Sequence, residues 1–163
     1  MIRKDEILKL KTNIDKLLIL SINKQVIYDE IMKNNDSEII VLKNDIATKI
    51  KELQENEDYK KLEDAMCNLI FSLPKYELYN LYTAFSIGRL GKDEIILKEE
   101  YLVQLDRAKY LCNDKYYLQE KLVNTEYFLL NKYLNSGLKC LYNLTCLPKN
   151  SKVEYRMIKK KEI

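Results

Sequence analysis

The scarcity of glycine and proline limits the possible folds of this chain more than any other feature of its sequence. Its 163 residues include three glycines and two prolines, far below the usual shares of roughly 7% and 5%. Strand-rich folds need many tight turns, and those turns depend largely on glycine, proline, asparagine and aspartate. The chain is therefore predicted to form long helices, and its length suits one domain with a sizeable core.

The clearest turns lie in the segment Leu69–Gly91, which holds one of the two prolines and two of the three glycines. Proline cannot continue a preceding helix but suits the first position of a new one. We therefore expect one helix to end near Ser72 and the next to begin at Pro74. Either Gly88 or Gly91 is expected to end this second helix with a positive φ.

Apolar residues recur at helical spacing along nearly the whole chain. Ser21 is expected to cap a second helix in which Ile22 and Val26 face inward. The run Ile39–Leu42 fits a helix start or a short strand, and we favour the helix because no second strand candidate pairs with it. Gly137 is expected to mark the C-terminus of a helix. A kink near Asn124 and Thr125 fits the segment 115–136. The segments with helical periodicity are 2–21, 22–33, 37–54, 59–72, 74–87, 94–112, 115–136 and 138–147.

This periodicity predicts an all-α fold, with a single compact bundle of six or seven helices over residues 1–148 and a basic, flexible tail over residues 149–163. The tail has six basic and two acidic residues, a net charge of +4, whereas the other 148 residues have 22 basic and 23 acidic ones, a net charge of −1. A nucleic-acid-binding domain usually carries its basic excess on the folded surface. The charge distribution therefore argues against that class.

The compartment is predicted from the N-terminus and the cysteines. The opening MIRKDEILKLK has charges where a signal peptide would be apolar, and no aliphatic run exceeds four residues, which is too short to cross a bilayer. The four cysteines contain no CxxC pair. We expect a cytoplasmic protein with free thiols and no membrane partner.

The residues available for catalysis are limited because the chain contains no histidine, the side chain best suited to proton transfer near neutral pH. The adjacent carboxylates Glu99 and Glu100, and Glu63 and Asp64, point about 100° apart on a helix, so we interpret them as surface charges. Cys112 lies near two lysines that could lower its pKa, but we favour an ordinary core cysteine. The prediction is a protein that is not an enzyme and uses no metal or cofactor.

The thirteen tyrosines, with no tryptophan, are the most unusual part of the composition. Exposed tyrosines are enriched in protein interfaces, and they also stack on nucleic-acid bases. Packing at the edge of the core with the hydroxyl in water is the common structural alternative. The candidate partner-binding residues are Tyr76, Tyr79, Tyr116 and Tyr117.

A second candidate set consists of basic residues that could contact an anion or a nucleic acid. The segment Gly88–Gly91 lacks the spacing and the trailing Lys-Ser/Thr of a phosphate-binding loop, although amides that open a following helix can bind anions. Three lysines in a tail give only weak, salt-sensitive attraction to phosphates. The candidate contacts are Arg89, Lys92, Lys159, Lys160 and Lys161.

Three segments between about residues 18 and 141 resemble a small bacterial family known as domain of unknown function 3775. They are LLILSINKQVIYDEIMKN, LIFSLPKYELYNLYTAFSIGRLG and YFLLNKYLNSGLKCL. In that family a helix rich in leucine and alanine runs into a Gly-Arg-Gly-like corner, a place that Gly88, Arg89 and Gly91 would take here, with Leu90 inserted. The resemblance implies a helical fold and assigns no activity.

These observations favour a non-enzymatic protein–protein interaction module that binds through a tyrosine-bearing helical face. A regulatory adaptor or a small inhibitor fits this description, including the antagonists that phages and other mobile elements carry against host systems. The alternative is a helical protein that associates with RNA or nucleotides through Arg89, Lys92, nearby tyrosines and the tail. Another protein is the expected partner, and a homo-oligomer is left open.

Overall fold

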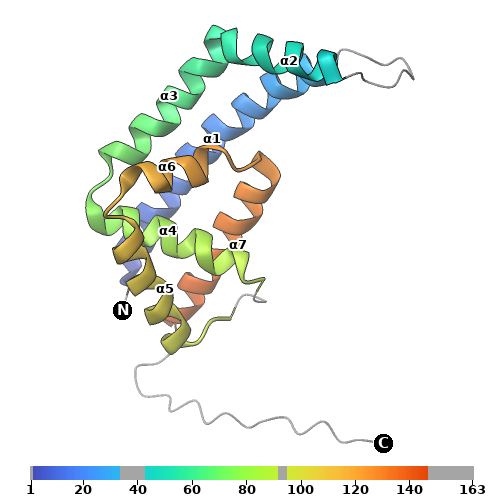
Figure 1. Cartoon of the computed structure of the whole chain (residues 1–163). Helices are drawn as coiled ribbons and strands as arrows, with labels where there is room; N and C mark the ends of the chain where they lie inside the picture. Colours follow the sequence, from blue (N-terminus) through green and yellow to red (C-terminus); the bar gives the residue numbers. More distant parts are fainter. Residues whose placement is uncertain (1, 34–42, 92–94, 147–163) are drawn as a thin grey trace, which may run out of the picture.

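The computed structural model describes residues 2–33, 43–91 and 95–146, which form seven helices and no strand (Figure 1). The all-α fold is therefore confirmed for these residues, whereas the predicted tail and the run Ile39–Leu42 lie outside them. The helices are α1 (Lys4–Lys33), α2 (Lys43–Glu55), α3 (Glu57–Ser72), α4 (Lys75–Arg89), α5 (Lys98–Leu111), α6 (Lys115–Val123) and α7 (Tyr127–Cys146).

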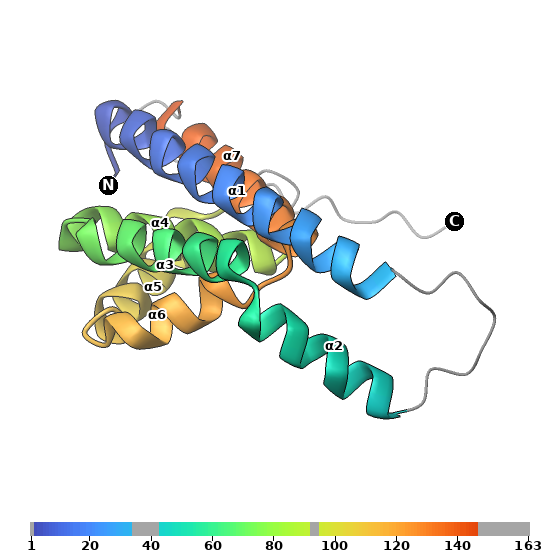
Figure 2. The same ribbon diagram turned by 90° about the horizontal axis from the view of Figure 1, so that it is seen from above.

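The helices stack in three layers, seen most clearly from above in Figure 2. The long helix α1 lies beside α7 in the first layer, α3 and α4 form the second, and α5 and α6 cover the other side of these two helices. Helix α2 packs against the far ends of α1 and α3 and extends away from the bundle (Figure 1). The outer surface of the α1–α7 pair is consequently uncovered by other described helices.

A single cluster of buried apolar side chains joins six of the seven described helices, with no contribution from α2. It is formed by the inward stripes of α1, α3, α4, α6 and α7, together with a few residues of α5. The largest fully buried side chains are Leu10, Ile14, Leu17, Met66, Ile70, Leu78, Leu81, Ile87, Leu118, Leu122, Leu130 and Leu134.

The predicted turn at Pro74 is confirmed, since α3 ends at Ser72 and α4 begins directly after the proline. Of the two glycines proposed to end α4, Gly91 has the positive φ, at 65°. Gly88 instead lies inside α4, where its missing side chain allows close contact with α7.

The predicted helix end at Gly137 is wrong, because α7 continues through this residue to Cys146. Gly137 lies against the backbone of Ala84 in α4, so its absent side chain serves helix packing and not helix termination. The segment 115–136 is two helices and not one, with α6 ending at Val123 and α7 beginning at Tyr127, so the chain breaks where a kink was considered, at Asn124 and Thr125.

The predicted helix start at Ser21 is wrong as well, because α1 runs unbroken from Lys4 to Lys33 and Ser21 is buried inside it. Ile22 and Val26, which were expected to face inward, are exposed. Because α1 is one continuous helix, the direction of each side chain follows from its position relative to the buried stripe that begins at Ile7. Ile22 and Val26 therefore point away from the core.

Candidate protein-binding surface

The two candidate tyrosines of α4 have different environments. Tyr76 is exposed, its hydroxyl donates a hydrogen bond to Glu77 Oε1 at 2.9 Å, and Lys9 Nζ of α1 lies 5.9 Å from its ring centroid. Tyr79 is half-buried and packs against the core. Of this pair, Tyr76 is the one whose ring is open to a partner.

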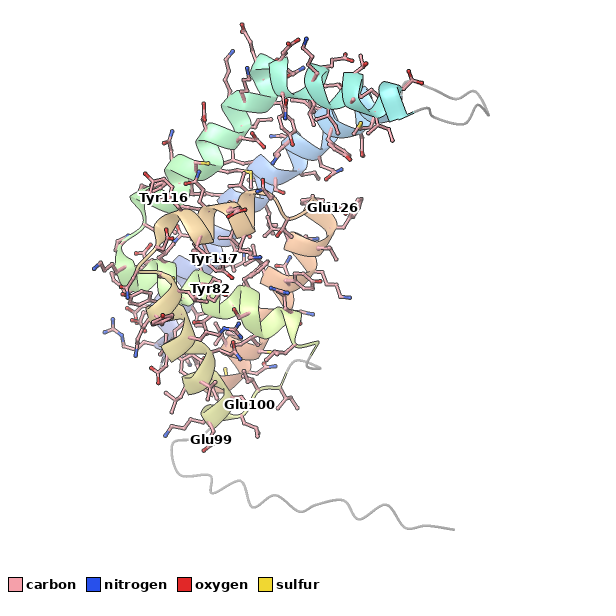
Figure 3. The ribbon with its side chains drawn as sticks, in the orientation of Figure 1. Tyr82, Glu99, Glu100, Tyr116, Tyr117 and Glu126 are labelled. Carbon is pink, nitrogen blue, oxygen red and sulfur yellow. The ribbon has the colours of Figure 1, made fainter. Side chains whose placement is uncertain are left out.

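The two candidate tyrosines of α6, both labelled in Figure 3, also differ in their exposure. Tyr116 is exposed and meets Phe71 of α3 edge-on, with 5.4 Å between ring centroids. Tyr117 is half-buried and shares a hydrogen bond with Tyr82 of α4, whose pKa is raised mainly by burial. Tyr117 therefore joins α6 to α4, while Tyr116 is a surface residue.

The structure does not gather the four tyrosines into one face. The two exposed rings pack on different helices, Tyr76 beside α1 and Tyr116 beside α3. Their use in partner binding stays a prediction, with each ring belonging to its own part of the surface.

The candidate basic contacts are described only in part. Arg89 is exposed at the end of α4, and its guanidinium carbon lies 5.7 Å from the ring centroid of Phe85. Lys92, Lys159, Lys160 and Lys161 lie outside the described residues. The association with RNA or nucleotides therefore stays a prediction.

A buried ammonium group, which the sequence reasoning missed, links three parts of the fold. Only 12% of the Lys24 side chain is exposed, and its Nζ lies 2.9 Å from Glu63 Oε1 of α3. The same Nζ donates to the carbonyl oxygen of Val123 at 2.8 Å and lies 5.0 Å from the ring centroid of Tyr59. The burial of Lys24 could have been inferred from its spacing, since Lys24 follows the buried Leu17 by two helical turns and lies on the same side of α1.

A polar pocket of about 230 Å³ surrounds this lysine at the α6–α7 junction, and its wall includes Tyr28, Tyr59 and Tyr127. Burial, followed by the charge of Glu63, raises the pKa of Tyr59 to about 12. Because the ammonium of Lys24 already satisfies the carboxylate, the carbonyl and the ring, this pocket is a structural junction. Glu63, interpreted from the sequence as a solvated charge, is instead the ion-pair partner of Lys24.

Neither Cys67 nor Cys112 has a thiol with a lowered pKa. Burial raises the pKa of Cys112 to about 12, so the alternative of a lowered value is wrong. Burial also raises the pKa of Cys67. Within the described residues there is no group of three or more histidine, cysteine, aspartate or glutamate side chains that could hold a metal ion.

An apolar groove of about 540 Å³ runs between α1 and α7. These helices are antiparallel, so the first turns of α1 meet the last turns of α7 (Figure 2). Leu8 and Tyr142 border the groove and are 68% and 54% exposed. The residues of this α1–α7 groove are Lys4, Ile7, Leu8, Lys11, Leu138, Lys139, Tyr142 and Asn143.

Further exposed apolar residues lie on the same side of α1, beyond the exposed ion pair of Lys11 and Asp15. Leu8, Ile19, Ile22 and Val26 are all exposed. At 100° per residue, their positions fall within an arc of about 60° on the helix. Helix α1 thus has exposed apolar residues on a second side besides its buried stripe, and of these only Ile22 and Val26 were expected from the sequence to face the core.

The groove is positively charged. Among its eight residues three are lysines and none is acidic. Lys11 Nζ lies 2.6 Å from the carboxylate of Asp15, which adjoins the groove on α1. The groove therefore combines an apolar floor with a net positive rim.

No family model matches the chain, and neither a curated protein nor a solved structure matches it. The resemblance to domain of unknown function 3775 stays a prediction. None of the described helices combines the length and the apolar character needed to cross a membrane.

Proposed function

We propose that this chain is a non-enzymatic protein-binding module that acts in the cytoplasm and docks its partner on the outer surface of α1 and α7. The observation that carries the proposal is the α1–α7 groove, bordered by the exposed Leu8 and Tyr142. Large apolar groups gathered in a concave, water-exposed surface favour binding of another apolar surface. A groove between two helices suits the helix-in-groove mode of recognition.

The exposed tyrosines extend this proposal without replacing it. Tyr142 belongs to the groove itself, and aromatic side chains often supply most of the energy of a protein interface. Tyr76 and Tyr116 lie elsewhere on the surface and are secondary candidates. A regulatory adaptor or an inhibitor fits a module that works by occupying its partner.

The proposal is tested by capturing partners from the native cell with three tagged forms of the protein. Leu8→Glu places a charge on the groove, while Val103→Glu makes the same change on α5, where Val103 is 62% exposed. Both variants should keep the wild-type melting temperature within about 2 °C, because surface substitutions cost little.

We expect quantitative mass spectrometry to identify a protein retained equally by the wild type and Val103→Glu, and at least tenfold less by Leu8→Glu. A set of retained proteins that does not respond to Leu8→Glu would contradict docking on this surface.

A further inference from the structure

We infer that α2 is a lid that opens as one unit from the ends of α1 and α3, while the other described helices stay folded. Three features of α2 support this inference. They are its separation from the main core, the small surface that holds it closed, and its one-residue connection to α3. All three are independent of the α1–α7 groove.

Helix α2 packs outside the main core. None of its described residues belongs to the cluster of buried apolar side chains that joins the other six helices. Leu53 of α2 and Ile31 near the end of α1 are both buried, but neither is part of that cluster. Apolar packing that is separate from the main core can be lost without exposing the core, which is the condition for local opening.

The surface that holds α2 closed is small. Among the residues of α2 whose side chains are described, Leu53 alone is buried, whereas Ile46 and Ile50 are exposed. A hydrogen bond from Lys49 Nζ to the carbonyl oxygen of Met32, at 2.9 Å, ties α2 to the end of α1. One buried leucine and a partly buried hydrogen bond stabilise the closed position far less than the main core stabilises the bundle.

The packing of α2 against α3 is also incomplete. An open groove of about 410 Å³ separates the two helices, and it is lined by Ile50, Leu53, Gln54, Tyr59, Lys60 and Glu63. Glu63 and Tyr59 are also the ion-pair and ring partners of Lys24. Opening of α2 therefore uncovers two of the groups that surround Lys24.

The connection to α3 provides a turning point. Helix α2 ends at Glu55 and α3 begins at Glu57, so Asn56 alone joins them. Its backbone is extended (φ −68°, ψ 116°), and its Oδ1 accepts a hydrogen bond from the amide of Tyr59 at 2.8 Å. This N-cap satisfies an amide that would need a preceding helical turn if α2 and α3 were one helix. The start of α3 is therefore stable without α2.

Native-state hydrogen exchange of the full-length protein, followed by NMR, tests the inference. The interior amides of α2 should have protection factors at least about 100-fold lower than those of α4 and α7. They should agree with one another within about threefold and respond weakly to urea, because a local opening exposes little surface. Protection that falls steadily towards one end of α2 would mean fraying and would overturn the inference.

Two variants of α2 form a matched pair, since Leu53→Ala and Ile46→Ala both shorten an apolar side chain but only Leu53 is buried. Leu53→Ala should lower the protection of α2 at least about tenfold, because it removes the buried group that holds the lid closed. The protection of α7 should not change. Ile46→Ala should leave both helices at their wild-type values.

Three other results would overturn the inference. Equal protection of α2 and α7 in the wild type would mean that α2 opens only when the whole bundle unfolds. A loss of protection in α7 that matches the loss in α2 of Leu53→Ala would mean the same. No protection anywhere in α2 of the wild type would mean that the closed position is not populated.

Discussion

Gly88 of α4 lies directly against the backbone of Tyr133 of α7, so closely that a Cβ at Gly88 would come within 1.8 Å of the Tyr133 carbonyl oxygen. Gly137 has the same relationship to Ala84, also at 1.8 Å. Ala84 and Gly88 are four residues apart in α4, and Tyr133 and Gly137 are four residues apart in α7. Each pair therefore lies on one face of its helix. Two residues without side chains thus bring the backbones of α4 and α7 into contact, and this contact holds α7 in the position from which it borders the groove.

Gly88→Ala and Gly137→Ala should therefore each lower the free energy of unfolding by more than about 3 kcal/mol, because the added methyl group meets backbone and not a flexible side chain. Gly91→Ala is the matched control, since Gly91 has a φ of 65° but no atom near the added Cβ. It should cost about 1 kcal/mol through backbone strain alone. Urea unfolding measures all three, and equal losses for Gly88→Ala and Gly91→Ala would refute close packing at this crossing.

Lys24→Met should lower the free energy of unfolding by about 2 kcal/mol, because Glu63 and the Val123 carbonyl lose a partner that is largely buried. Lys51→Met removes an ion pair with Glu55 that is exposed on both sides, and it should cost less than about 0.5 kcal/mol. The comparison is made by denaturant unfolding of both variants. Similar small losses would mean that the Lys24 junction contributes nothing beyond an ordinary surface pair.

Thr83→Val should raise the free energy of unfolding by about 1 kcal/mol. The Thr83 side chain is fully buried, and its hydroxyl oxygen has no hydrogen-bond partner in the structure, so the substitution removes a desolvated polar atom at nearly constant volume. Thr125→Val should instead lower the free energy of unfolding, because the Thr125 hydroxyl donates a hydrogen bond to the Lys121 carbonyl. Thermal unfolding should show Thr83→Val to be more stable than the wild type, and a destabilised variant would show that the hydroxyl is satisfied.

Alkaline pH should destabilise the protein partly through Cys112. Its pKa in the folded state is about 12, raised by burial from an ordinary 9.0. Below pH 9 the thiol is neutral in both states, and its full contribution is present. As the pH rises from 9 towards 12 the unfolded chain releases the proton first, so stability falls, by on the order of 2 kcal/mol at pH 11.

Cys112→Ala should therefore lose less stability between pH 8 and pH 11 than the wild type does. Cys146→Ala, which changes an exposed thiol, should follow the wild-type curve. Urea titrations at the two pH values give the differences. Parallel curves for all three proteins would show that Cys112 ionises equally in the folded and unfolded states.

The helical fold and the turn at Pro74 could be predicted because both depend on local chemistry. Proline restricts its own backbone and that of the residue before it, whatever the rest of the chain does. The all-α class likewise follows from spacing and from the scarcity of glycine and proline. Neither feature needs a partner elsewhere in the sequence.

The errors arose where one residue type serves two purposes. A glycine such as Gly137 can end a helix or allow a second backbone to approach, and the choice depends on Ala84, which is far away in sequence. Ser21 can begin a helix or be buried within one. Ile22 and Val26 could not be assigned to the surface from periodicity, because apolar spacing identifies a face without showing whether another helix covers it.

The α1–α7 groove was missed for the same reason. Leu8 lies outside the buried stripe of α1, and Tyr142 was not among the tyrosines assigned to partner binding. Their proximity depends on the antiparallel packing of α1 and α7, which joins the two ends of the described chain. The position of Leu8 outside the buried stripe could be recognised from the sequence. Only the fold shows that Tyr142 lies beside it.

Photocrosslinking in the native cell tests whether the outer surface of α1 and α7 binds a partner protein. A benzophenone amino acid replaces either Tyr142, in the groove, or Tyr110, an exposed tyrosine of α5. We expect irradiation to link the Tyr142 position to one discrete partner protein and to leave the Tyr110 position without that adduct. No adduct from the Tyr142 position, or the same adduct from both positions, would contradict it.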